Sequence, residues 1–184
     1  MPAQHTLDRP MNPARDIRRA LSEDAEHIAG LWARTLRDAY GGLMPTDFSD
    51  SVSVEQRAAK LRHAIAAGTR VSFVAFSSTS LVGFCGLSAA RDVDLTGDFG
   101  EITVVAVERS SRRRGYGRGL IESARGEAVR RGWHTLVLWV VAANADARAF
   151  YERDGWSPDG ATKVDHRLEF SAPLIRYRTS PGPH

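Results

Sequence analysis

Apolar residues recur every three or four positions in four segments of the chain, which predicts four amphipathic helices. The first begins at Ser22, with acidic residues in its first turn, and the glycine pair after Tyr40 ends it. The second follows a capping box formed by Ser53 and Gln56. The third opens after a glycine-rich turn, and Asn144 caps the fourth. Helices therefore occupy both halves of the chain.

Short apolar runs between the helices predict strands. These runs lie at residues 16–21, 71–76, 81–87, 101–107, 135–141, 162–170 and 174–179. The second and third strands are separated by a short polar turn and are expected to form a hairpin, as are the last two. The run at 135–141 is continuously apolar, which is typical of a strand covered on both faces. The pattern predicts one mixed α/β domain at 15–179, with a disordered tail at 1–14 and a second tail at 180–184.

Composition is that of a globular protein, with 42% hydrophobic and 26% charged residues among 184. The single cysteine, Cys85, excludes an intramolecular disulfide and a cysteine-based metal cluster, and we expect it to be a packing residue in a reducing cytoplasm. No run of about 18 apolar residues exists, and residues 1–13 lack the hydrophobic core of a signal peptide. The histidines, at 27, 63, 134 and 166 among others, show no metal-ligand spacing. We therefore predict a cytoplasmic protein with neither a metal nor a membrane span.

The net charge is +3, and much of the positive excess is concentrated where the strand at 101–107 enters a glycine-rich turn. Such a turn before a helix exposes backbone N–H groups and the positive end of the helix dipole, which suits a phosphate. Gly115, Gly117 and Gly119 would permit positive φ and close approach of a ligand. The dinucleotide fingerprint fails because Leu120 stands where its third glycine should be, and no Gly-Lys-Ser/Thr follows for a nucleotide loop.

An arginine–glycine segment could instead bind RNA, or it could be a solvated loop. The apolar strand before it and the amphipathic helix after it favour an ordered turn. Tyr116 is the one aromatic residue within it, which is too few for base stacking. We therefore expect no nucleic-acid partner.

Two motifs carry a resemblance to a known family. The first is Arg112-x-x-Gly115-x-Gly117, and the second is Asn144-x-x-Ala147-x-x-Phe150-Tyr151-x-x-x-Gly155-Trp156. Separated by one predicted helix and one strand, they resemble the motifs of the GNAT superfamily of acetyl-CoA-dependent N-acetyltransferases. The resemblance is close over 101–156. It implies an α/β (α+β) fold with a central mixed, mostly antiparallel twisted sheet of about six to seven strands, flanked by about four helices.

The resemblance also implies how acetyl-CoA is held. Its pyrophosphate would bind the backbone amides of the turn, and arginine side chains would reach the adenosine phosphate. The residues so assigned are Arg112, Arg113, Arg114, Gly115, Tyr116, Gly117 and Arg118. Val105 and Val107 would bond the pantetheine arm through their main chain, as a further strand would. Asn144, by itself an N-cap, would also contact the pantetheine or the acetyl group.

For catalysis the resemblance implies direct transfer in a ternary complex. Tyr151, otherwise a half-buried helix residue, would protonate the leaving thiolate. Glu101, otherwise a solvated strand start, would act as general base, often through water, with Asp98 as the alternative. A main-chain N–H near Val105 would stabilise the oxyanion.

The acceptor would be a primary amine of a small molecule or peptide, bound partly by the stretch at 32–45. Arg176 and Arg178 could face an acceptor carboxylate, but we interpret them as a solvated edge. A catalytically silent CoA-binding sensor or interaction module is the alternative, although the presence of Tyr151 and Asn144 speaks against it. Either a monomer or a homodimer is compatible with the sequence.

Overall fold

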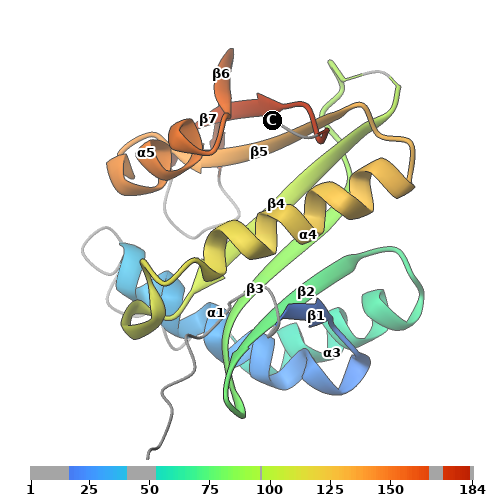
Figure 1. Ribbon diagram of the computed structural model, residues 1–184, viewed down its shortest axis with the longest axis vertical. Coiled ribbons are helices and arrows are strands. Elements are labelled where there is room, and N and C mark those ends of the chain that lie inside the picture. Colours follow the sequence, from blue (N-terminus) through green and yellow to red (C-terminus); the bar gives the residue numbers. More distant parts are fainter. Residues whose placement is uncertain (1–16, 41–52, 96, 166–171, 183–184) are drawn as a thin grey trace, which may run out of the picture.

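A seven-stranded mixed sheet forms the centre of the protein (Figure 1), which is known from a computed structural model that describes residues 17–40, 53–95, 97–165 and 172–182. The strands are ordered β1-β2-β3-β4-β5-β7-β6. In chain order the described elements are β1 (Ile17–Arg19), a 3-10 turn (Ser22–Asp24), α1 (Ala25–Tyr40), α3 (Val54–Ala66), β2 (Val71–Ser77), β3 (Ser80–Ala89), β4 (Phe99–Val107), a second 3-10 turn (Arg109–Ser111), α4 (Tyr116–Arg130), β5 (Thr135–Val141), α5 (Ala145–Arg153), β6 (Ser157–Asp165) and β7 (Ala172–Thr179). The expected mixed, mostly antiparallel sheet is confirmed.

Only β4 and β5 pair in parallel, and every other neighbouring pair of strands is antiparallel. A parallel pair needs a crossover connection, which α4 supplies along the sheet (Figure 1). One hydrophobic cluster joins α4 and Tyr151 of α5 to one face of the sheet. A second cluster joins α1 and α3 to the opposite face. The domain therefore has a helix layer on each side of the sheet.

Helix starts show which polar residues act as caps. Ser53 accepts a hydrogen bond from the Gln56 backbone N–H at 3.1 Å, as its position predicts. Ser22 was expected to start the first helix, but Asp24 supplies the capping carboxylate. It accepts from the Leu21 N–H at 2.7 Å and pairs with Arg18 at 2.7 Å. A carboxylate that also binds a cation stabilises the start of the helix better than a serine hydroxyl.

Strand boundaries agree with the prediction to within about two residues, except at the start of β6. The run at 135–141 is β5, as predicted, but β6 begins at Ser157 and not at 162. An irregularity between Pro158 and Thr162, with Gly160 at a φ of +91°, breaks the two-residue alternation on which the prediction relied. The rest of that predicted strand, at 166–170, lies outside the described residues, as do both predicted tails except Ser180, Pro181 and Gly182.

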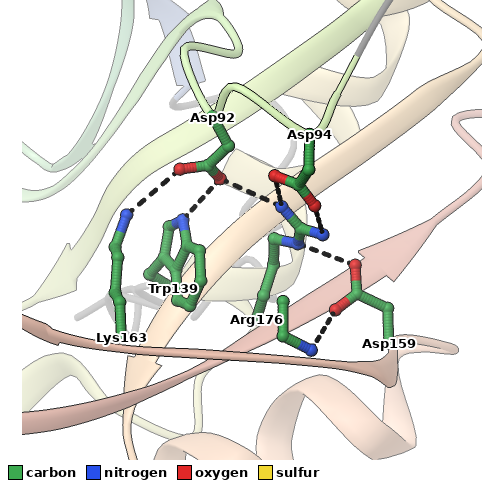
Figure 2. A network of polar contacts seen from close by, with 7 residues as sticks. Asp92, Asp94, Trp139, Asp159, Lys163 and Arg176 are labelled. Atoms are coloured by element: carbon green, nitrogen blue, oxygen red, sulfur yellow. Dashed lines mark hydrogen bonds and ion pairs between the residues drawn. The ribbon is translucent and has the colours of Figure 1, made fainter.

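Arg176 corrects the interpretation of the last strand as a solvated edge. Because β7 lies between β5 and β6, this side chain is buried, at 5% exposure. Figure 2 shows carboxylates from two other segments converging on its guanidinium. Nε donates to Asp159 at 2.7 Å, both terminal nitrogens donate to Asp94 at 2.9 and 2.6 Å, and Nη1 also reaches Asp92 at 3.3 Å. The arginine therefore joins the β3–β4 loop to the C-terminal hairpin, while Arg178 is exposed as expected.

Asp92 extends this network towards the neighbouring strands. It accepts from Trp139 Nε1 at 2.9 Å and from Lys163 Nζ at 3.3 Å (Figure 2). Lys163 also lies 3.8 Å from the centroid of the Trp139 ring. The β3–β4 loop is thereby attached to β5 and β6 as well as to β7.

None of the helices in the described part of the chain is both long enough and apolar enough to span a membrane.

Replacing Arg176 by Met is expected to lower the free energy of unfolding by about 2–4 kcal/mol, because the buried Asp159 carboxylate loses its cation. The hydrogen bond from Arg176 also lowers the pKa of Asp94. The contribution of this pair is therefore complete above about pH 4 and is lost as pH falls through the lowered pKa. Urea denaturation at neutral and acidic pH measures both effects.

Arg178→Met is the matched control on the same strand, and its cost should stay within about 0.5 kcal/mol because its side chain is exposed. Equal losses in the two variants would show that the carboxylates around Arg176 contribute no specific stability.

Candidate active site

The parallel strands β4 and β5 separate halfway along their length. Their pairing runs from Phe99 with Thr135 to Ile102 with Leu138 and goes no further. Beyond that point β4 continues to Val107, and among the described strands it is paired there with β3 alone. The edge of β4 that faces β5 therefore has no strand partner at 103–107 in the described part of the chain, which leaves main-chain hydrogen-bonding groups for a ligand.

A β-bulge marks the point of separation. Gly86 of β3 pairs with Val104 and Leu87 pairs with Ile102, so Thr103 is the extra residue. A bulge kinks its strand and increases the local twist, which turns β4 away from β5. After the bulge, Val105 and Val107 pack with α4, whereas Val104 packs with the α1 side.

The predicted main-chain contacts at Val105 and Val107 thus lie on the free edge. The Val107 carbonyl accepts a bond from Arg112 Nε at 3.1 Å, which ties the turn to the end of the strand.

The turn after β4 leads directly to the N-terminus of α4. Arg113 and Gly115 both have left-handed backbones, with φ of +61° and +87°. Gly115 occupies the N-cap position and makes no side-chain cap. The first intrahelical acceptor there is the Gly115 carbonyl, bonded to the Gly119 N–H at 3.0 Å. The earlier N–H groups of the helix therefore lie at its positive end without a capping side chain.

Exposed arginine side chains lie close in sequence to the N-terminus of α4. Arg112, Arg113, Arg114 and Arg118 are all exposed, and the first turn carries no acidic residue. Arg118 lies 3.9 Å from Asp154, a loose contact. A helix end of this kind with arginines beside it has the charge that suits an anion.

The three alternating glycines have different roles. Of the three, Gly115 alone has a positive φ, so the predicted conformational freedom is used there and not at Gly117 or Gly119. A Cβ on Gly117 would lie 3.3 Å from Phe150, and one on Gly119 would lie 2.6 Å from Ile17. The later glycines therefore allow α4 to pack closely against α5 and β1.

Tyr116, assigned to the cofactor site, directs its ring into the core. It is 1% exposed, and its hydroxyl has no hydrogen-bond partner in the described part of the chain. Only its main chain remains available to a ligand.

Tyr151 lies in an aromatic cluster on the α4 side of the sheet. Its ring centroid is 5.2 Å from that of Phe150, 5.9 Å from that of Trp156 and 6.5 Å from that of Tyr177. The residue is 9% exposed, and its hydroxyl forms no hydrogen bond with any described residue. Burial raises the pKa of Tyr151, and nearby Cys85, Tyr40 and Asp154 raise it further. The phenol is therefore protonated at neutral pH and has a proton to donate.

The C-terminal end of α5 is held in place next to this tyrosine. Asp154 accepts from Trp156 Nε1 at 3.2 Å and pairs with the buried Arg125 of α4 at 3.1 Å. Two residues earlier, Glu152 accepts from the Tyr177 hydroxyl at 2.7 Å. These bonds fix the helix that positions Tyr151.

Asn144 joins the N-terminus of α5 to the end of α1. Its Oδ1 accepts from the Ala147 N–H at 3.0 Å, as an N-cap does, and its Nδ2 donates to the Tyr40 hydroxyl at 3.2 Å. A hollow of about 310 Å³ lies here. It is lined by Ala39, Tyr40, Val141, Ala143, Asn144, Ala145 and Asp146. The part of the predicted acceptor stretch that the structure describes ends at Tyr40, on the wall of this hollow.

Glu101 lies in the paired part of β4, opposite Val137 of β5, two residues before the bulge. Its neighbour Ile102 packs with α4, so Glu101 belongs to the face covered by α1 and α3. Asp98 lies just before β4, where its carbonyl accepts from the His134 N–H at 3.0 Å. Asp98 is therefore at the opposite end of the β4–β5 pairing from the point where the strands separate. Of the two candidate bases, Glu101 is the one near that point.

Sequence reasoning missed Arg57 and Arg70, two arginines on the same face as Glu101. Arg57 lies 3.3 Å from the Trp32 ring centroid, and Arg70 donates to the Thr103 hydroxyl. The sequence did contain a clue for Arg57, which precedes the buried Leu61 by four residues and therefore lies on the same face of the helix. A cation on a helix face that packs against the protein needs a partner, which could have drawn attention to this residue.

Other candidate groups have structural roles. Cys85 is fully buried, and burial raises the pKa of its thiol to about 12, so it is a packing residue as expected. The described histidines His27, His63 and His134 are exposed. Across the described ranges, no group of three or more His, Cys, Asp and Glu residues could hold a metal ion.

Comparison with protein families matches residues 33–156 to the acetyltransferase (GNAT) family. No curated protein sequence matches the chain.

Solved structures share the fold. A ribosomal-protein-alanine N-acetyltransferase from Brucella melitensis superposes with a TM-score of 0.71 at 22% identity, covering 89% of this chain and 98% of that one. The PaiA N-acetyltransferase from Thermoplasma acidophilum, in complex with coenzyme A, gives 0.68 at 17%, covering 87% and 96%. The yncA protein from Salmonella typhimurium, with its cofactor acetyl-CoA, gives 0.69 at 19%, covering 91% and 94%.

The family match spans more than half of the chain and includes the separated strands, the glycine turn and Tyr151. This protein therefore belongs to the acetyltransferase (GNAT) family, and it is an acyltransferase of the N-acetyltransferase class.

Proposed function

We propose that the protein transfers an acetyl group from acetyl-CoA to a primary amine of a small molecule or peptide, by direct attack in a ternary complex. The observation that supports this most is the free edge of β4 at 103–107, which the turn at 108–115 connects to the uncapped N-terminus of α4. A ligand with an extended arm bound along that edge could place a phosphate group at the N-terminus of α4.

Residues of the turn fit the pyrophosphate of acetyl-CoA. The helix end offers backbone N–H groups, Gly115 has no side chain to cover them, and Arg113 and Arg114 are exposed beside them. The PaiA structure contains coenzyme A and the yncA structure contains acetyl-CoA, and both share this fold. We assign pyrophosphate binding to the main chain at 112–117, with arginine side chains reaching the adenosine phosphate.

Main-chain groups of Val105 and Val107 would hold the pantetheine arm by strand addition. Acetyl-CoA supplies a thioester, whose carbonyl carbon accepts the amine and whose thiolate departs. A main-chain N–H near Val105 would donate to the carbonyl oxygen and stabilise the oxyanion that forms. Asn144, already oriented by the Ala147 N–H, would contact the arm or the acetyl group at the edge of the hollow.

Two protons move in the reaction. The amine nitrogen forms a bond to the carbonyl carbon and loses a proton towards Glu101, directly or through water. The carbon–sulfur bond breaks, and the thiolate takes a proton from the Tyr151 hydroxyl. This hydroxyl has no hydrogen-bond partner among the described residues, so no internal bond has to break before it donates.

Tyr151→Phe is expected to lower kcat by about 10²–10⁴-fold, because the thiolate loses its proton donor. Affinity for acetyl-CoA should stay nearly unchanged, since the variant keeps the ring and its packing. Thiol release measured over a panel of amines gives kcat, and calorimetry gives the Kd.

Tyr177→Phe is the control, since it changes the same aromatic cluster. It removes the bond to Glu152 and should cost about 1 kcal/mol of stability with little change in kcat. Undiminished turnover in Tyr151→Phe would remove Tyr151 from the mechanism.

The raised pKa of Tyr151 also predicts the pH profile. A phenol whose pKa is raised keeps its proton beyond the usual value of about 10, so its acid form is fully populated below that pH. Deprotonation of Tyr151 should therefore cause no decrease in kcat between about pH 8 and 10. A falling limb in this range that disappears in Tyr151→Phe would contradict the assignment.

Gly115→Ala is expected to raise the Kd for acetyl-CoA at least about 10-fold, because a Cβ at a φ of +87° strains the turn that presents the amides. The control is Gly126→Ala on the exposed side of the same helix, where an added Cβ meets nothing within 4 Å. That change should raise stability by about 0.5–1 kcal/mol and leave the Kd unaltered. Equal Kd values in both variants would place the pyrophosphate elsewhere.

Tight binding of acetyl-CoA without acetylation of any amine would favour the silent sensor. Absence of cofactor binding would overturn the proposal.

A further inference from the structure

Arg57 of α3 lies in a half-buried position and has no acidic partner in the described part of the chain. Its guanidinium carbon is 3.3 Å from the centroid of the Trp32 ring, and no ion pair joins it to a carboxylate in the described residues. Burial and, to a smaller extent, the nearby charge of Arg70 together lower the pKa of Arg57 to about 10. One face of the guanidinium is covered by the indole, so its N–H groups are directed outward in the plane.

Arg70 lies at the end of the α3–β2 connection. It donates to the Thr103 hydroxyl and makes no ion pair with an acidic group in the described part of the chain. Gly86 makes room for it, since a Cβ there would lie 3.3 Å from Arg70 Nε and 2.8 Å from Thr103 Oγ1. Burial lowers the pKa of Arg70, which the exposed Arg91 also lowers, while Cys85 and Glu101 act in the opposite direction.

These two arginines differ from the buried arginines elsewhere in the fold. Arg125 pairs with Asp154 at 3.1 Å, and Arg176 is surrounded by three carboxylates. A desolvated cation without such a partner is costly, and two of them side by side are more so. An anion that binds there would remove the penalty.

The pair is next to the proposed reaction centre. Thr103, which binds Arg70, is the first β4 residue beyond the last β4–β5 pair, and Glu101 precedes it by two residues. Trp32 and Arg57 belong to α1 and α3, the helices that cover this face of the sheet. An acceptor whose amine approaches Glu101 therefore brings the rest of its structure towards the arginines.

We propose that Arg57 and Arg70 bind a carboxylate of the acceptor, so that the substrate is an amine that bears a carboxylate a few bonds away. The inference rests on the proposed acetyl transfer and specifies its acceptor. A planar guanidinium matches a carboxylate through two parallel hydrogen bonds, and two such groups beside one acidic residue suit a single negative charge. Free amino acids and short peptides both carry this group.

A binding experiment tests the carboxylate site without turnover. The probes are N-acetyl-amino acids and their C-terminal amides, titrated by NMR into the complex with coenzyme A. The acids should bind about 10- to 100-fold more tightly than the amides, because a charge-assisted pair is lost in the amide. Arg57→Gln and Arg70→Gln should abolish the preference, whereas Arg57→Lys should retain part of it.

Arg62→Gln is the matched control on the same helix, because Arg62 is exposed and pairs with Glu26 at 2.8 Å. It should keep the full preference. Equal binding of acids and amides by the native protein would overturn the inference, as would a preference that survives in both glutamine variants.

Initial rates complete the test with free amino acids, dipeptides and their amides as acceptors. The preference for the carboxylate should lie mainly in KM, and the glutamine variants should raise KM for the acids while the Kd for acetyl-CoA stays constant. The ratio of amino acid to dipeptide rates distinguishes the two sources of the carboxylate. Selective binding of the acids without acetylation of any amine would leave the carboxylate site standing and overturn the proposed transfer, so the two failures are distinguishable.

Discussion

The separation of β4 from β5 after Ile102 is the constraint on which the site depends. Parallel strands in a sheet normally satisfy each other's main-chain groups, so ending the pairing leaves donors and acceptors that need another partner. The bulge at Thr103 provides the local kink, and the glycines of β3 and α4 allow the neighbouring elements to pack close to it. One irregular residue thus opens the edge, sets which side chains of β4 face each helix layer, and places the Thr103 hydroxyl next to Arg70.

Buried and half-buried arginines have different surroundings on the two sides of this separation. In the C-terminal half, Arg176 is neutralised by carboxylates from the β3–β4 loop and from β6, which makes it a structural joint between segments distant in sequence. In the N-terminal half, Arg57 and Arg70 are desolvated, and no carboxylate among the described residues forms an ion pair with either of them. The first arrangement stabilises the fold, and the second suits an anion supplied by a ligand. An acceptor carboxylate, which the sequence analysis weighed for Arg176 and set aside, is thus better matched by the proposed pair Arg57 and Arg70.

Tyr151 shows how packing can set both the position and the protonation state of a proposed proton donor. Three aromatic rings surround it, and Asp154 links its helix to Arg125 of α4, so the side chain has little freedom to turn away. The same burial keeps the phenol protonated. Position and protonation state therefore have one cause, the aromatic cluster on the α4 side of the sheet.

The sequence by itself determined the elements and their order, because helix and strand periodicities, caps and turn glycines are local properties. It also determined the family motifs: the arginine–glycine turn, and the helix that carries Asn144 and Tyr151. It could not separate the three glycines of the turn, since Gly117 and Gly119 meet Phe150 and Ile17 only in three dimensions. It mistook Arg176 for an edge residue because strand order is a property of the whole sheet. The bulge at Thr103 was likewise decided by tertiary structure, as was the lack of an acidic partner for Arg57 and Arg70 among the described residues, since whether a charge finds a partner depends on segments far apart in the chain.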